Sequence, residues 1–152
     1  MKTIILSVIL IVTLSCSKNN VEQSFTPQNI VPALIGKGIF SGNENISPQT
    51  TVIYDSAVWN DILNSLDQGT LQQFTETTGV DFNTFQLIAV IDTLYPSPTY
   101  EVKITTITEN ENNIVVNYEK IFTPSASSVY AQSFHFVKMP KSIKPVTFVL
   151  LQ

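Results

Sequence analysis

The chain has 152 residues, a single-domain length that can bury roughly two-thirds of the surface of its unfolded form. Its 12 acidic residues outnumber its eight basic residues, so the formal net charge at pH 7 is −4. This balance excludes nucleic acid as a partner, because nucleic-acid-binding domains carry a basic stripe. All eight basic residues are lysines, and without arginine the chain lacks the forked guanidinium that grips phosphate with two hydrogen bonds.

The first residues have the pattern of a bacterial lipoprotein signal peptide. Lys2 supplies a positive charge, and the apolar stretch at 4–14 has signal-peptide length but is too short to span a bilayer. A small residue then precedes Cys16, the only cysteine of the chain. This arrangement resembles a lipobox, although Thr13 stands where an aliphatic residue is usual. We predict a signal peptide at 1–15 and a diacylated Cys16; the alternative is a plain secreted protein with an incidental cysteine.

A lipidated cysteine would leave the exported domain without a disulfide, so its stability must come from its hydrophobic core. Residues 16–28 are polar and aperiodic, which predicts a flexible tether to a single domain at 29–152. The lipid would hold this domain at a membrane surface. Acidic residues just after the cysteine mark export to the cell surface in some Gram-negative lipoproteins, and none stands at 17–20. We therefore expect an outer-membrane protein of the cell envelope that faces the periplasm rather than the cell surface.

The first part of the domain predicts two strands and one helix. A strand at 33–40 contains two glycines, which favour a bend or bulge, and a second strand follows at 50–54. The helix is expected at 56–66, where five apolar residues fall on one face of a 3.6-residue period. Asp55 or Ser56 can cap its first turn. Trp59, the only tryptophan, lies on the apolar face, so we expect it to pack the helix against a sheet.

The stretch 81–104 predicts the centre of the domain. Residues 87–91 form a continuous apolar run of strand length, as expected for a strand that is covered on both faces. Residues 101–104 alternate between polar and apolar, as a half-buried strand does. We predict that these two strands pair as a hairpin around the proline-containing loop 92–99.

Three further strands are predicted at 114–118, 129–139 and 146–150. A polar turn at 109–113 precedes the first of them, and a polar loop at 123–128 separates the first from the second. No βαβ alternation is present. The sequence therefore predicts an α+β fold that is mainly antiparallel β, a sandwich or open barrel of about seven strands with one packed α-helix.

No pattern predicts catalysis, a metal or a cofactor. A Ser-His-Asp site would have to use His135, the only histidine, and no spacing favours a particular serine or aspartate beside it. One histidine and a lipidated cysteine are too few ligands for zinc. The turn at 109–113 has the composition of an ordinary hydrophilic turn rather than of a calcium site. We expect a protein that is not an enzyme; an enzyme would need a polar partner beside His135.

Three lysines, Lys138, Lys141 and Lys144, fall within seven residues and form a local positive segment in an acidic protein. Lysines and prolines together often keep an exposed strand edge from pairing with other chains, which is one interpretation. The other is docking of an acidic partner surface, which salt would weaken.

Several segments, taken in order, resemble the C-terminal domain family of the protease complex subunit PrcB. They are the tryptophan-bearing helix at 56–66, the Val-Asp-Phe entry at 80–82, the apolar strand that leads to a loop and Tyr100, and the segment 133–148. The most specific parts are the entry and the Phe-His-Phe-Val-Lys-Met-Pro-Lys run at 134–141. The resemblance covers roughly residues 50–150, and lipoproteins of Bacteroidetes-type bacteria often carry this domain alone behind a lipobox. It implies association with, and stabilisation of, a secreted protease, without catalysis.

The chain departs from the family pattern in the loop before Tyr100. The family usually has a small pair such as Gly-Gly there, and this chain has Ser97-Pro98-Thr99. Glycine permits a positive φ and close backbone approach, whereas Pro98 forbids both at its position. Pro98 therefore puts in question whether this loop keeps the binding role that it has in the family.

We therefore expect a lipid-anchored, non-enzymatic interaction domain, either an accessory subunit of an envelope protease or a partner of another envelope protein. The candidate contact residues are Leu94, Tyr95, Pro96, Pro98, Tyr100, His135, Lys138, Lys141 and Lys144. The alternative is a small-ligand or glycan-binding lipoprotein that uses Tyr95, Tyr100 and Trp59.

Metabolic labelling with a fatty acid tests the anchor. The wild-type protein should incorporate label and Cys16→Ala should incorporate none, because Cys16 carries the only thiol that can be acylated. Equal labelling of the two proteins would rule the anchor out.

Overall fold

The computed structural model describes residues 24–77, 79–96, 100–122, 124 and 128–152. Its strands are β1 (Gln28–Ile30), β2 (Ala33–Phe40), β3 (Gln49–Ile53), β4 (Phe85–Ile91), β5 (Tyr100–Glu109), β6 (Ile114–Phe122), β7 (Gln132–Pro140) and β8 (Val146–Leu151). Its helices are α1 (Ser56–Asn64) and α2 (Gln68–Leu71). Within the described ranges, no helix is long and apolar enough to cross a membrane.

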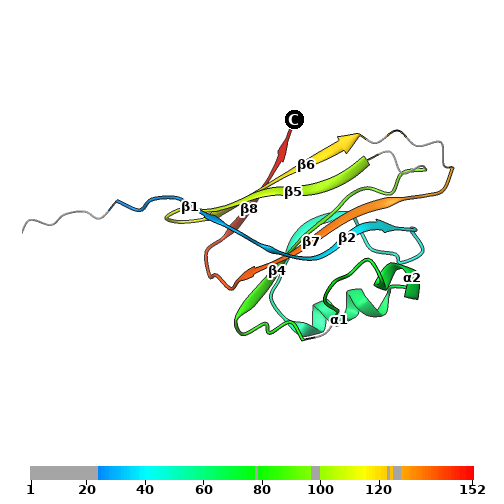
Figure 1. Ribbon diagram of the computed structural model, residues 1–152, viewed down its shortest axis with the longest axis horizontal. Coiled ribbons are helices and arrows are strands. Elements are labelled where there is room, and N and C mark those ends of the chain that lie inside the picture. Colours follow the sequence, from blue (N-terminus) through cyan, green and yellow to red (C-terminus); the bar gives the residue numbers. More distant parts are fainter. Residues whose placement is uncertain (1–23, 78, 97–99, 123, 125–127) are drawn as a thin grey trace, which may run out of the picture.

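The strands form two four-stranded sheets, which confirms the α+β, sandwich-like prediction. The central sheet has the order β2-β7-β4-β3, and the outer sheet has the order β1-β5-β6-β8. Neighbouring strands are antiparallel except β6 and β8, which are parallel. Figure 1 shows the resulting layers, with the outer sheet above, the central sheet in the middle and the two helices below. The central sheet is therefore covered on both faces.

Two hydrophobic clusters fill the spaces between these layers. One lies between the helices and the central sheet and is rich in aromatic residues: Phe40, Trp59, Phe74, Phe134 and Phe136 belong to it. The other lies between the two sheets and is mainly aliphatic, with members that include Ile88, Val90, Val102, Ile107, Ile114, Val116 and Val137. Alternate residues of β4 and β7 point into the two clusters, so these two strands join the clusters into one body.

β4 is buried on both faces, as its continuous apolar run predicts. Every residue from 86 to 91 is buried, and the strand lies inside the central sheet between β3 and β7. The predicted hairpin with the strand at 101–104 is wrong, because β5 belongs to the outer sheet. The alternation of polar and apolar residues in β5 correctly gives its buried face, but a two-residue period does not determine which strand is its partner.

The predicted helix and its cap are present. The side chain of Asp55 accepts hydrogen bonds from the backbone amides of Ala57 at 2.9 Å and Val58 at 3.0 Å. Trp59 is 2 % exposed and its ring lies 5.7 Å from that of Phe136 on the central sheet. The tryptophan therefore packs helix against sheet, as predicted. The sequence prediction missed α2, a single turn that is capped by Asp67.

The two glycines of β2 allow the end of the helical layer to approach the strand closely. The register between β2 and β7 shifts between Leu34 and Gly36, which is the irregularity predicted there. A Cβ atom at Gly36 would collide with the ring of Phe74, and one at Gly38 would collide with the side chain of Gln73.

At the start of the described chain, β1 pairs with the Glu109 end of β5. The chain therefore enters the fold at that end.

Candidate functional site

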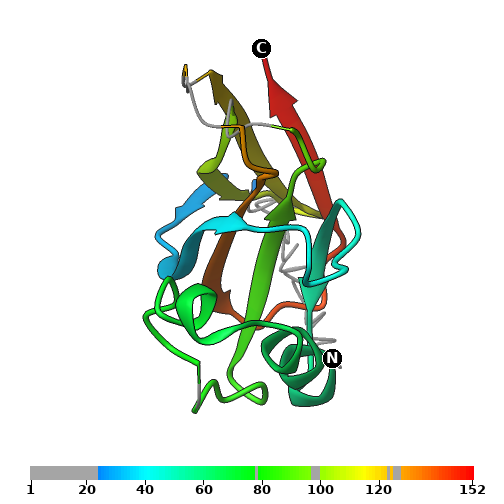
Figure 2. The same ribbon diagram turned by 90° about the vertical axis from the view of Figure 1, so that its right-hand side faces the viewer.

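The end of the sandwich opposite the chain entry exposes the inner face of the outer sheet. Along β6, every second residue points toward the central sheet, and Ile114 and Val116 are fully buried while Phe122 is 60 % exposed. Phe122 is exposed because β4 ends at Ile91, so the central sheet does not extend far enough to cover the last inward-facing residues of β6. Figure 2 shows β8 (red) continuing beyond the end of β4 (green). Leu150, which lies beside Tyr118 in the register of β6 and β8, is 45 % exposed there.

Three aromatic rings gather at this end, and we call Tyr95, Tyr100 and Phe122 the aromatic cluster. The ring centroids of Tyr95 and Tyr100 are 5.3 Å apart, and those of Tyr100 and Phe122 are 5.6 Å apart. These tilted and edge-on geometries are the favourable ones for aromatic pairs. Tyr100 is 36 % exposed, so the cluster presents ring surface to solvent although its members contact one another.

Backbone hydrogen bonds hold the loop that carries Tyr95. Tyr95 and Ala131 exchange two backbone hydrogen bonds of 2.9 Å each, and the amide of Asp92 donates to the carbonyl of Ser133 at 2.9 Å. The side-chain amide of Gln132 donates to the carbonyls of Ile46 at 3.0 Å and Asp92 at 2.9 Å. The pairing of β4 and β7 therefore continues into the loop and holds the backbone of Tyr95 in place.

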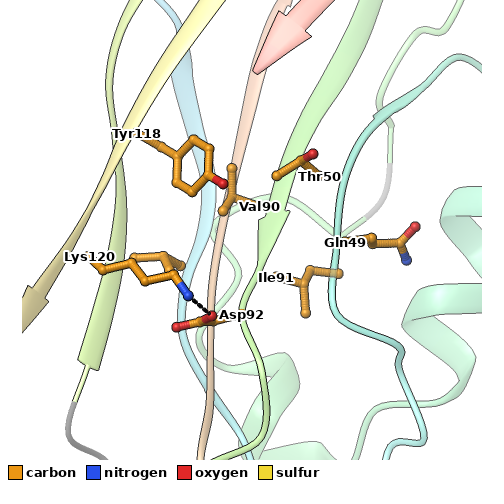
Figure 3. Close-up of a pocket in the computed structure, with 8 residues that line it drawn as sticks. Gln49, Thr50, Val90, Ile91, Asp92, Tyr118 and Lys120 are labelled. Carbon is orange, nitrogen blue, oxygen red and sulfur yellow. Dashed lines mark hydrogen bonds and ion pairs between the residues drawn. The ribbon is translucent and has the colours of Figure 1, made fainter. Parts of the chain in front are cut away.

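An ion pair between the sheets lies beside the aromatic cluster. The Nζ atom of Lys120 donates to Oδ1 of Asp92 at 2.5 Å (Figure 3). The same oxygen accepts from the amide of Thr93 at 2.7 Å. Burial alone would lower the pKa of Lys120, but the hydrogen bond and charge of Asp92, with a smaller contribution from Tyr95, raise it overall. Lys120 is therefore a cation over the whole neutral pH range.

The second oxygen of Asp92 is unsatisfied. The Asp92 side chain is 3 % exposed, and among the described residues its Oδ2 atom has no hydrogen-bond partner. A buried polar atom in this state costs about 1–3 kcal/mol, and more when the group is charged. Buried unsatisfied groups are rare in folded proteins, and each one calls for a physical reason.

Asp92 and Lys120 line a pocket of about 170 Å³ between the sheets. Figure 3 shows the pocket residues, which come from β3, from the end of β4 and from β6; β5 adds one wall. They are Gln49, Thr50, Val90, Ile91, Asp92, Val102, Tyr118 and Lys120. Within the described residues, no three His, Cys, Asp or Glu side chains are grouped to hold a metal ion.

The structure brings together only part of the predicted contact set. Leu94, Tyr95, Pro96 and Tyr100 lie at the open end of the sandwich, where Leu94 packs against Gly42, whose φ of +92° suits glycine. Pro98 and Cys16 fall outside the described residues.

The three lysines do not form a free basic patch. Lys138 pairs with Glu76 at 2.5 Å, and Lys141 donates to the carbonyl of Phe82 at 2.7 Å. Lys144 pairs with Glu109 at 2.7 Å, at the end of β5 that is remote from Tyr100. The edge-protection interpretation is wrong for Lys138, because β7 is an inner strand of its sheet.

His135 is an internal structural residue rather than a surface contact. It is 7 % exposed, and its Nδ1 atom accepts a hydrogen bond of 2.8 Å from the amide of Ile104 in the opposite sheet. Ser133, two residues earlier on β7, accepts from the amide of Val102 at 2.9 Å in the same way. These two bonds tie β7 to β5 through groups that would otherwise be buried without partners.

Sequence reasoning missed the ion pair, the pocket and Phe122. A usable signal existed for Lys120, because it continues the inward series Ile114, Val116 and Tyr118 as a charged residue on an otherwise apolar face. An inward-facing charge needs a partner. Asp92 is 28 residues away in the chain, and only the folded arrangement identifies it as that partner.

No family model, curated protein or solved structure matches the chain. The resemblance to the PrcB C-terminal domain family therefore stays a prediction.

The pH dependence of stability tests the role of His135. Burial in the first place, and then the charge of Lys37, lower the pKa of His135 from 6.5 to about 4; Glu101 opposes this shift and Lys103 adds to it. As the pH falls from 6.5 toward 4, only the unfolded chain binds the proton, so the folded state loses up to about 3 kcal/mol. Below pH 4 both states are protonated and this loss stops growing.

His135→Asn keeps a hydrogen-bond acceptor for the Ile104 amide and removes the titration. Urea unfolding at a series of pH values should show a smaller loss for the variant than for the wild type between pH 6.5 and 4. The acidic residues titrate in both proteins and cancel in the comparison. Parallel curves would show that His135 titrates normally in the folded protein.

Proposed function

We propose that the protein is a lipid-anchored, non-enzymatic envelope protein whose domain binds another protein, as an accessory or stabilising subunit of an envelope protease or a comparable assembly. Support comes first from the aromatic cluster, which combines exposed ring surface with a fixed position. Aromatic side chains are enriched at the centres of protein interfaces, and a few such anchors supply most of the binding energy.

The surroundings of the cluster extend it into a larger apolar surface. Leu94, Val129 and Tyr130 are all exposed and come from the two loops that meet at this end. Contiguous exposed apolar surface on a soluble domain marks a site of interaction. Because backbone hydrogen bonds already order Tyr95, docking there would lose little conformational entropy.

The position of the cluster relative to the chain entry also suits this function. The entry lies at the Glu109 end of β5, where Phe25 is within 4.5 Å of the ammonium of Lys144. Tyr100 begins the same strand at the other end, so the two ends are separated by the length of a ten-residue strand, roughly 30 Å. In Figure 1 the chain enters on the left and β5 begins on the right. A lipid at Cys16 would therefore be attached through the end of the domain that is remote from the aromatic cluster.

The paired lysines change which residues we assign to binding. Lys138, Lys141 and Lys144 already have partners within the domain, and His135 is internal. We therefore place docking on Leu94, Tyr95, Tyr100 and Phe122. Trp59, which the glycan-binding alternative would use, belongs to the core between helix and sheet and is not available to a ligand.

Affinity purification from detergent-solubilised envelope tests the proposal. The wild-type protein should retain a protease, or another envelope protein, in stoichiometric amount. Replacing both Tyr100 and Phe122 with alanine should reduce the recovered partner by at least about tenfold, because truncation of two anchor residues removes about 2 kcal/mol or more.

A matched control removes apolar surface elsewhere. Tyr54 and Val58 are exposed to a similar degree on the helical side, so Tyr54→Ala with Val58→Ala should retain the partner at the wild-type level. Recovery of no stoichiometric partner by the wild type would contradict the proposed function. Equal losses in the two double variants would show that docking does not use the aromatic cluster.

A further inference from the structure

The pocket between the sheets has a polar end with one unsatisfied carboxylate oxygen. Asp92 offers Oδ2, a buried oxygen with no partner among the described residues, while its Oδ1 atom already accepts from Lys120 and Thr93. An occupant that donates a hydrogen bond to Oδ2 would satisfy it. A ligand that fits this site should therefore carry a hydrogen-bond donor. The pocket, with a volume of about 170 Å³, can hold a small molecule.

The charges at this end favour a neutral occupant. The charges of Asp92 and Lys120 neutralise each other. A cationic ligand drawn to the carboxylate would be repelled by the adjacent ammonium, and an anionic ligand drawn to the ammonium would be repelled by the adjacent carboxylate. Either ion would lose its hydration without a net Coulombic gain in return. A hydroxyl group avoids this penalty, because it donates and accepts hydrogen bonds without a charge.

Two neighbouring hydroxyls would match the ion pair as it stands. An ammonium has three N–H groups; on Lys120, Asp92 and the hydroxyl of Tyr95 engage two of them, which leaves one for a ligand. One hydroxyl of a ligand can donate to Asp92 Oδ2, and the next can accept from Lys120 Nζ. Adjacent hydroxyls on a saturated ring have this spacing.

The remaining walls suit the carbon face of such a ring. Val90 and Val102 supply aliphatic surface from the two sheets. Tyr118 adds an aromatic ring from β6, opposite Val90 (Figure 3). Gln49 and Thr50 close the β3 side with neutral polar groups. A pocket with apolar walls and a few convergent polar groups is the usual form of a small-molecule site.

We propose that the Asp92–Lys120 pocket binds a neutral sugar ring, one pyranose unit in size, through two adjacent hydroxyls. The pocket adjoins the aromatic cluster, since Tyr95 contributes to the environment of Lys120, but the binding of a sugar goes beyond the docking of a protein on the exposed rings. The chain would then recognise a carbohydrate between its sheets and a protein on its exposed rings.

An NMR titration of the purified, ¹⁵N-labelled protein with methyl β-D-glucopyranoside tests the proposal. Amide signals of pocket residues such as Thr50, Val90 and Tyr118 should shift with a dissociation constant on the order of 1–10 mM, which is weak as expected for one ring. Glucosamine, a cation, and glucuronate, an anion, should bind at least about tenfold more weakly.

Three variants make the test specific. Asp92→Asn keeps the size of the side chain but lacks the free carboxylate oxygen, so it should bind the neutral sugar at least about tenfold more weakly. Glu109→Gln removes a carboxylate that pairs with Lys144 at the far end of β5, and its affinity should stay within about twofold of the wild type. Lys120→Gln leaves Asp92 without its cation, so this variant should prefer glucosamine over the neutral sugar.

Several results would overturn the proposal. These are no shift at the pocket residues with the neutral sugar, equal binding of the charged sugars by the wild type, or unchanged binding by Asp92→Asn. If Asp92→Asn does not fold, the preference of Lys120→Gln decides, and a continued preference for the neutral sugar would count against the assignment. None of these outcomes depends on whether the aromatic cluster binds a protein.

Discussion

The structure depends on the pairing of β4 with β7, two inner strands that are covered on both faces. Their alternate residues enter both hydrophobic clusters, so neither cluster can form unless this pair is in register. A buried backbone group without a hydrogen-bond partner costs free energy, and β4 lies between two neighbouring strands that satisfy its amides and carbonyls. The same register sets the ends of the two strands, at Ile91 and Gln132, where the candidate site begins.

The second constraint is polar and acts between the sheets. Ser133 and His135 of β7 accept hydrogen bonds from Val102 and Ile104 of β5, although the surroundings are mainly aliphatic. Such bonds are directional, so they fix how far β5 can slide over the central sheet, which dispersion contacts alone do not fix. The position of Tyr100, at the start of β5, follows from them. His135 can serve in this place only as a neutral acceptor, in agreement with its lowered pKa.

The parts of the fold that the sequence predicts are those that short stretches decide. The run at 87–91 shows a strand buried on both faces, and the spacing around Trp59 with Asp55 before it shows a capped helix that packs on a sheet. These features depend on neighbours within about a turn of helix or a strand length. The pairing partner of β5 is not determined by local sequence. An alternating pattern shows which face of the strand is buried but not which strand lies beside it. The predicted hairpin, which joined β5 to the preceding strand β4, was therefore wrong.

The same distinction explains the candidate site. Tyr95 and Tyr100 could be named from the sequence because they flank a proline-containing loop between strands. The partners of Lys138 and Lys144 could not be named, since ion pairs with Glu76 and Glu109 join residues that are far apart in the chain. The unsatisfied oxygen of Asp92 could not be predicted from the sequence either, because its burial depends on how the two sheets pack against each other.

Native-state hydrogen exchange tests most directly whether the site is a rigid extension of the central strand pair. Strand amides of β4 and β7 should exchange slowest, through global unfolding. The amides of Asp92 and Tyr95, which donate to β7 and to the residue just before it, should exchange far more slowly than those of the exposed turn at 110–113, apart from the hydrogen-bonded Asn110 amide. If Asp92 and Tyr95 exchange as fast as that turn, the aromatic cluster and the pocket are not held in place by the β4–β7 pair, contrary to this prediction.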